Sequence, residues 1–223
     1  TPIYLAAENG HTSLIMSLHE RGAGIDLPNA KGWTPLFIAT LVGDMDVVEC
    51  LCELGADVLH CCRDGSNCIS IACQAGHAEV TMFLYQQGAE LKNKDIDGTT
   101  PLVIATYRGH TSIVELLIGW GVNVNQPGMN GATPLNIAAE EGHKIIAKML
   151  LTAGANCNVP DDDGITPLII ACHEGHSDII NLLHSFGADF SYKSKSGCTA
   201  MGAAIAGEHN SIIKLLYEIW NDP

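Results

Sequence analysis

Histidine is the residue of this sequence with the greatest catalytic potential, because its ring exchanges protons near neutral pH. The chain of 223 residues contains 10 histidines. Six of them lie at equivalent positions of a pattern that repeats every 33 residues, and we call such a set of equivalent positions a column. A catalytic site needs a single constellation of acid, base and nucleophile, whereas a residue repeated along the chain serves every repeat alike. We therefore predict a structural role for this column and no catalytic residue; its members are His11, His77, His110, His143, His176 and His209.

Cysteines and acidic residues could instead bind a metal ion. The 9 cysteines form no Cys-x-x-Cys pair and no zinc-like pattern with histidine. The run Asp161-Asp162-Asp163-Gly164 lacks the alternating acidic spacing and the distal glutamate of a calcium loop. We expect no metal and no cofactor. Free thiols used as small apolar residues indicate a reducing, intracellular compartment, and we expect the cytoplasm.

The composition narrows the possible partners. The formal net charge is −14, which counts against nucleic acid and anionic membranes because both attract Lys and Arg. No apolar run reaches the roughly 18 residues of a membrane span. The chain begins at Thr1 in the middle of its repeating pattern, so we expect a piece of a longer protein.

The helices and turns that position these residues can be predicted from the same 33-residue repeat. Thr-Pro pairs, such as Thr34-Pro35, recur at 33-residue intervals, and Asn67-Cys68 fills one slot of the series. Threonine or asparagine caps a helix N-terminus, and proline is favoured at the first helical position. Glycines at two later columns end a short first helix and a longer second helix, and a third glycine allows a tight turn. Each unit is therefore a helix pair with a projecting hairpin, and such units must stack to bury their apolar faces.

Over essentially its whole length the sequence resembles the ankyrin-repeat family, through Thr-Pro-Leu-x-x-Ala, Gly-His, Gly-Ala-Asp/Asn and Asp-x-Asp-Gly. The resemblance implies an all-α ankyrin-repeat solenoid of stacked helix-turn-helix pairs with projecting β-hairpin or loop tips. It departs from the family at the slot three residues after threonine, where the family usually has histidine and this chain has, for example, Phe37 and Asn136. We expect a single domain over 1–223, with approximate repeats at 1–24, 25–57, 58–90, 91–123, 124–156, 157–189 and 190–223.

In the ankyrin family the partner binds the concave face, which is formed by hairpin tips and first helices. The resemblance places three kinds of residues there. An apolar zone comprises Trp33, Leu41 and Val42; a mixed zone comprises Ile96, Tyr107, Arg108 and Met129; and an acidic zone, together with nearby tip and helix slots, comprises Glu140, Glu141, Asp162, Asp163, Ile165, His173 and Glu174. We expect a partner segment with an apolar anchor and with Lys or Arg. The alternative for Trp33 and Leu41 is that they only pack against neighbouring hairpins.

Three functions remain open from the sequence. The favoured one is a monomeric protein-interaction module or scaffold without enzymatic activity. The second is a substrate-recruiting region of a larger enzyme or signalling protein whose catalytic domain lies outside this sequence. The third is a modification substrate, because some ankyrin repeats are hydroxylated at a hairpin asparagine and Asn125 and Asn158 occupy such slots. Turn geometry explains those asparagines equally well.

Overall fold

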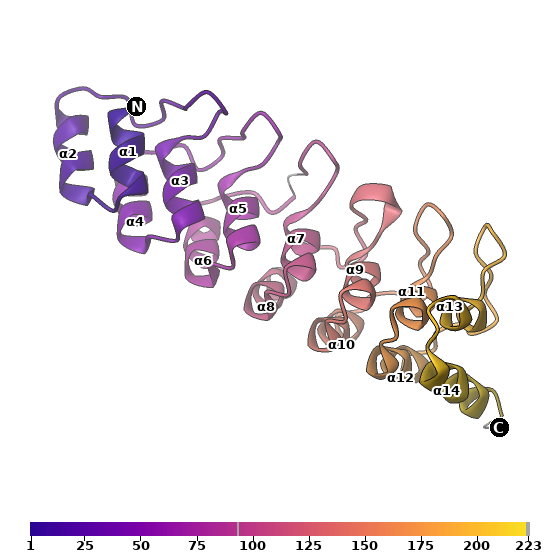
Figure 1. The fold of residues 1–223 in the computed structure, drawn as a ribbon. Coiled ribbons are helices and arrows are strands. Elements are labelled where there is room, and N and C mark those ends of the chain that lie inside the picture. The colour runs from indigo at the N-terminus through magenta and orange to yellow at the C-terminus, as the bar shows by residue number, and fades with distance from the viewer. Residues whose placement is uncertain (93, 222–223) are drawn as a thin grey trace. The chain divides into compact units, whose positions relative to one another are not determined.

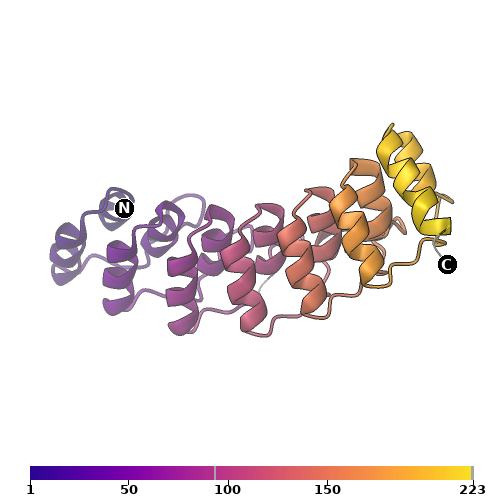
Figure 2. The same cartoon turned by 90° about the horizontal axis from the view of Figure 1, so that it is seen from below.

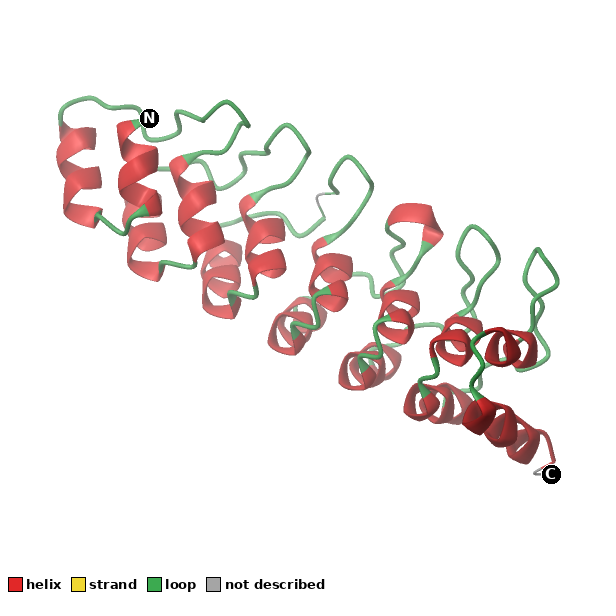
Figure 3. Ribbon diagram, in the orientation of Figure 1, coloured by secondary structure: helices red, strands yellow, loops and turns green. Residues whose placement is uncertain are grey.

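The computed structural model describes residues 1–92 and 94–221, and these form α-helices joined by loops and turns, with no strand among them (Figures 1 and 3). The predicted all-α fold class is confirmed. An isolated bridge joins Cys61 to Asn67, so the projecting tips are loops rather than regular β-hairpins. Residues 222–223 of the expected last repeat lie outside the described residues, and the expected repeat bounds stay a prediction.

The helices alternate between the first and the second member of a pair. The first helices are α1 (Pro2–Glu8), α3 (Pro35–Val42), α5 (Cys68–Ala75), α7 (Pro101–Tyr107), α9 (Pro134–Glu140), α11 (Pro167–Glu174) and α13 (Ala200–Ala206). The second helices are α2 (Thr12–Glu20), α4 (Met45–Glu53), α6 (Ala78–Gln86), α8 (Thr111–Gly119), α10 (Lys144–Thr152), α12 (Ser177–Ser185) and α14 (Asn210–Asn221). A short 3₁₀ turn, η1 (Met129–Gly131), lies in one of the loop tips.

The chain divides into two compact units, Thr1–Leu117 and Ile118–Pro223. In the first unit, α1, α3, α5 and α7 pack side by side in one layer, and α2, α4 and α6 pack in a second layer (Figures 1 and 2). In the second unit, α9, α11 and α13 form the first layer, and α10 packs on α12. Within each unit, every pair therefore covers the apolar face of its neighbour.

The helix ends show what the recurring threonine and glycine residues do in the structure. The Thr34 hydroxyl accepts a hydrogen bond from the Phe37 N–H at 3.2 Å, so it caps α3. Gly43 ends α3 with a φ of 81°, a left-handed conformation that glycine adopts without strain. Asn67 replaces threonine before α5, and its side chain and that of Ser70 cap each other's backbone N–H groups. The helix that lacks the proline thus begins with a reciprocal capping box.

The core runs between the two helix layers of each unit. The alanine column of the first helices is buried throughout, with Ala39, Ala72, Ala105 and Ala171 fully inaccessible to solvent. A side chain of this size lets neighbouring first helices approach closely. The close approach fixes the spacing of the loop tips and of the helix ends, which together carry the candidate binding surface.

Candidate protein-binding surface

The histidine column joins neighbouring helix pairs. His77 Nε2 lies 3.2 Å from the carbonyl oxygen of Leu41, at the end of the preceding first helix. His209 Nε2 lies 2.9 Å from the carbonyl of His173, and His110 and His176 make the same contact to a carbonyl 36 residues earlier. The structural role predicted from their repetition is confirmed at these positions.

The loop tips are joined to one another within each unit. The Ile96 N–H donates to the Asp64 carbonyl at 3.0 Å in the first unit. In the second unit the Asp162 N–H donates to the Asn130 carbonyl at 2.9 Å. These backbone bonds hold successive tips in a fixed register, so side chains on the tips face a partner as an ordered row rather than as independent loops.

The apolar and mixed zones of the first unit leave several large side chains in solvent. Ile96 is 73 % exposed at its tip, and Val42 and Tyr107 are about half exposed at the ends of α3 and α7. The Arg108 guanidinium lies 5.6 Å from the centre of the Tyr107 ring, within range of a cation–π contact. Leu41 is only partly exposed. The unit therefore presents separate apolar side chains and a cation at slots that vary from pair to pair.

Trp33 combines packing with exposure. Its ring stacks on Phe37 with a centroid separation of 5.1 Å, and Lys31 Nζ lies 4.8 Å from the Trp33 ring centre. Phe37 is buried, whereas Trp33 is partly exposed. The ring thus rests on the first helix that follows its own loop tip, and one part of it remains available to a partner.

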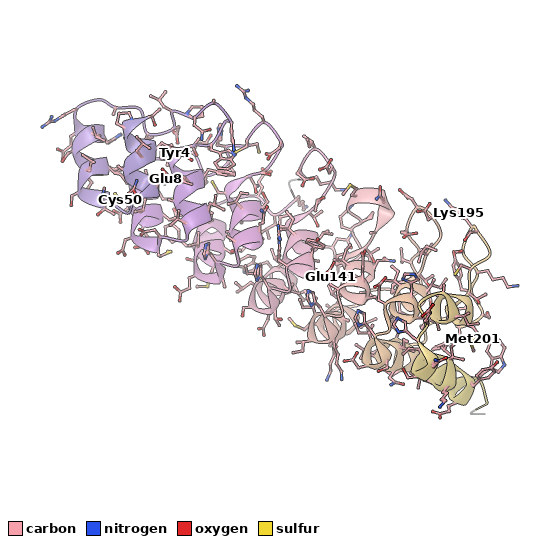
Figure 4. The ribbon with its side chains drawn as sticks, viewed as in Figure 1. Tyr4, Glu8, Cys50, Glu141, Lys195 and Met201 are labelled. Carbon is pink, nitrogen blue, oxygen red and sulfur yellow. The ribbon has the colours of Figure 1, made fainter. Side chains whose placement is uncertain are left out.

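The acidic zone lies within the second unit. Glu140 and Glu141 end α9, and His173 and Glu174 end the adjacent helix α11, where His173 Nδ1 contacts the Glu174 carboxylate at 2.7 Å. Asp162 and Asp163 are exposed on the tip before α11, and Ile165 behind them is partly exposed. Figure 4 shows Glu141 at a first-helix end and Lys195 on a loop tip. Met129, on η1, is 54 % exposed.

One carboxyl group of the acidic zone, that of Glu140, has a perturbed proton affinity. The pKa of Glu140 is raised, first because the group is partly removed from water and then because Glu141, Glu174 and Asp161 repel its charge. A cation placed among these groups would relieve that repulsion. The acidic zone is therefore an electrostatic site for positive charge, although no group of three or more potential ligands among the described residues is arranged to hold a metal ion.

Sequence reasoning missed the role of the loop asparagines. Asn125 Nδ2 donates to the Gly154 carbonyl at 3.2 Å, and Asn125 Oδ1 accepts from the Asn156 N–H at 2.8 Å. Asn158 makes the same two bonds to Gly187 and Asp189. The recurrence of Asn at these slots was the only available signal. Both amides connect neighbouring pairs, which turn geometry alone does not explain.

The buried cysteines behave as apolar residues. Cys62, Cys68, Cys73, Cys157 and Cys172 are buried free thiols. Burial raises the pKa of Cys68, Cys73 and Cys172 to about 12, so their reactive thiolate forms are scarce at neutral pH. Among residues 1–92 and 94–221, no helix has the length and apolar character that crossing a membrane requires.

Comparisons with known proteins agree with the geometry. The family model for ankyrin repeats (3 copies) matches residues 1–60, 69–161 and 135–222. A crystal structure of the human ASB11 ankyrin repeat domain aligns with a TM-score of 0.89 and 25% sequence identity, covering 100% of this chain and 99% of that chain. A search of curated proteins found no match. Because the family model matches nearly the whole chain, the chain belongs to the ankyrin-repeat family.

Proposed function

We propose that this chain binds a partner protein segment on the face formed by its loop tips and first helices. Ankyrin repeats are in general protein–protein interaction modules rather than catalysts. The proposal rests on one observation: surface positions that are equivalent from one helix pair to the next carry side chains of different chemical character. Slots that serve stacking repeat the same residue, whereas the tip and helix-end slots vary, with exposed apolar side chains such as Ile96 in the first unit and a group of exposed carboxylates in the second.

The first unit supplies apolar anchors. Val42, Ile96 and Tyr107 are exposed on α3, on a loop tip and on α7, so each offers a contact for a large side chain of a partner. Aromatic residues and arginine carry much of the binding energy at many interfaces. Trp33 belongs to this set because its stacking on Phe37 holds the ring in one orientation before a partner arrives.

The second unit supplies negative charge. Glu140, Glu141, Asp162, Asp163 and Glu174 are exposed acidic side chains on adjoining helix ends and one tip. Opposite charges on a partner accelerate its association and favour Lys or Arg over other residues, more than they add to affinity. The partner segment therefore carries basic residues where it meets this unit and large apolar residues where it meets the first unit.

Selection from a random peptide library on the folded chain tests the proposed surface. We expect the enriched peptides to contain Lys or Arg together with large apolar residues. The double variant Glu140→Lys and Glu174→Lys should weaken binding of a basic enriched peptide by about tenfold or more, because attraction becomes repulsion. The double variant Glu115→Lys and Glu218→Lys, on the second helices α8 and α14, is the charge-matched control and should leave the Kd unchanged. Equal losses in both proteins, or no loss in either, would reject the acidic zone as a binding site.

The role of Trp33 needs a separate test on an enriched peptide with an apolar anchor. We expect Trp33→Ala to weaken binding by about 2 kcal/mol, as is typical when an interface anchor is truncated. Met82→Ala removes another exposed apolar side chain, on the second helix α6, and should have no effect on binding. Calorimetric titration measures both. An unchanged Kd for Trp33→Ala would mean that the ring only packs on Phe37.

A further inference from the structure

Two cationic side chains lie on adjoining loop tips of the first unit, close to the Trp33 ring. Lys31 and Arg63 are both exposed. A Cβ added to Gly32 would lie 3.4 Å from Arg63 Cγ, so the stem of the Arg63 side chain packs against the tip that carries Lys31. The Gly32 carbonyl oxygen also lies 2.9 Å from His60 Nε2, just before the second tip in the chain. We call Lys31, Trp33 and Arg63 the cationic tip patch.

The exposure of the patch does not depend on where the sequence begins. Arg63 belongs to a tip that has a neighbouring tip on each side within the first unit, and it is exposed there. Asp64 and Asp163 are the equivalents of Lys31 in tips that are flanked in this way, and both are exposed. These tip positions therefore remain accessible to a partner when further tips lie beside them.

The positive charge of the patch is available to a partner, although the chain as a whole has a formal net charge of −14. The salt bridges found among residues 1–92 and 94–221 lie in the second unit, so neither Lys31 nor Arg63 takes part in one. Asp64 follows Arg63 in the chain, but its Oδ1 accepts a hydrogen bond from the Ser66 N–H at 3.0 Å, which holds that carboxylate in its own turn. The two cations can therefore attract a carboxylate from outside the chain.

The patch also places its charge beside an apolar contact. Asn29 Oδ1 accepts hydrogen bonds from the N–H groups of Lys31 at 2.9 Å and of Trp33 at 3.1 Å, so one side chain fixes the backbone that carries both residues. The Trp33 ring stacks on Phe37, and Lys31 Nζ lies 4.8 Å from the Trp33 ring centre. A partner can therefore meet an aromatic ring and a positive charge within the length of one side chain.

We propose that the cationic tip patch binds an Asp or Glu side chain of the partner, close in sequence to the apolar residue that contacts Trp33. The inference rests on the proposed function and specifies the chemistry of the same partner. Consecutive residues of an extended segment are roughly 3.3 Å apart, so the acidic residue lies within about two residues of the apolar anchor. The second unit selects Lys or Arg, whereas the patch selects a carboxylate. Like charges would repel if the two parts of the partner exchanged units, so the pattern gives the bound segment one direction.

Charge reversal on the two tips tests the patch. The probe is a peptide that is selected from the random library on the wild-type chain and loses affinity with Trp33→Ala. It is made with a C-terminal amide, so its acidic side chains are its only carboxylates. We expect Lys31→Glu with Arg63→Glu to raise its Kd by about tenfold or more. Lys148→Glu with Lys214→Glu, on the second helices α10 and α14, changes the net charge equally and should leave the Kd unchanged.

Changing the peptide shows whether its carboxylate meets these two cations. Replacement of its acidic residue by the corresponding amide should raise the Kd for the wild type by about fivefold, but should not weaken binding to the Lys31→Glu and Arg63→Glu variant. The patch is rejected, and the proposed function kept, if a peptide that depends on Trp33 binds equally with the acid and the amide, or if the second-helix control weakens binding as much. If no selected peptide depends on Trp33, the apolar anchor of the proposed function fails, and the patch fails with it. Circular dichroism confirms that every variant is folded.

Discussion

Gly43→Ala is expected to destabilise the protein by about 3 kcal/mol, far more than an alanine usually does at a surface glycine. Two effects add. The φ of 81° is unfavourable for any residue with a Cβ by roughly 1 kcal/mol. The new Cβ would also lie 2.4 Å from the His77 ring, so the ring must move and lose its bond to the Leu41 carbonyl. Overpacking of this kind typically costs about 1–3 kcal/mol. Urea denaturation measures the loss.

Gly55→Ala separates the two effects. Gly55 has nearly the same φ, 85°, but an added Cβ would meet nothing within 4 Å. Its substitution should therefore cost only the backbone strain of about 1 kcal/mol. In a His77→Ala background, Gly43→Ala should cost no more than Gly55→Ala, because the ring is gone. If Gly43→Ala and Gly55→Ala destabilise equally in the wild-type background, the histidine ring is not the obstacle.

Asn136→Asp is expected to destabilise the protein by about 3 kcal/mol at pH 7, although it replaces one amide nitrogen by oxygen. Asn136 is buried. Its Oδ1 accepts from the Thr133 N–H at 3.0 Å, and its Nδ2 donates to the Ile165 carbonyl at 3.2 Å. In the aspartate variant a carboxylate oxygen would face that carbonyl without a proton. Urea denaturation at several pH values, with the wild type measured beside the variant, checks this loss.

The pH dependence of the Asn136→Asp loss has a definite sign. Burial and the facing carbonyl favour the protonated acid, so its pKa is higher in the folded than in the unfolded state. The folded variant then binds more protons, and its stability relative to wild type falls as the pH rises above the unfolded value of about 3.9. Asn136→Ala loses both bonds and does not titrate, so its loss of about 2 kcal/mol should not depend on pH. Parallel pH profiles for the two variants would contradict the explanation.

The regular part of the fold was predictable because each column has a local physical cause. Thr34 and Pro35 favour a helix start, Gly43 favours a helix end, and repetition of these signals fixed the register. The surface slots followed from that register, and the structure finds Val42, Ile96 and Tyr107 exposed as expected. Local signals suffice here because each helix pair interacts mainly with its neighbours.

The contacts between pairs could not be derived in this way. The sequence showed that His77 and Gly43 recur, but not that the ring of one lies against the other, since they belong to different repeats. The slot where the family usually has histidine holds different residues in different copies of this chain. Phe37 packs against Trp33, whereas Asn136 keeps a polar link to its own cap and to the following loop. Such differences depend on which groups meet where two helix pairs pack together. A single sequence does not show which residues make these contacts.

The histidine–glycine junction also bears on how such a chain changes in length. His77 rests on Gly43 and His110 rests on Gly76 in the same manner, so one junction can substitute for another. Excision of residues 67–99 would bring His110 onto Gly43, and duplication of that segment would create one more junction of the same kind. Gene rearrangements in whole periods therefore need no new interface to evolve, and they can lengthen or shorten the binding row one pair at a time.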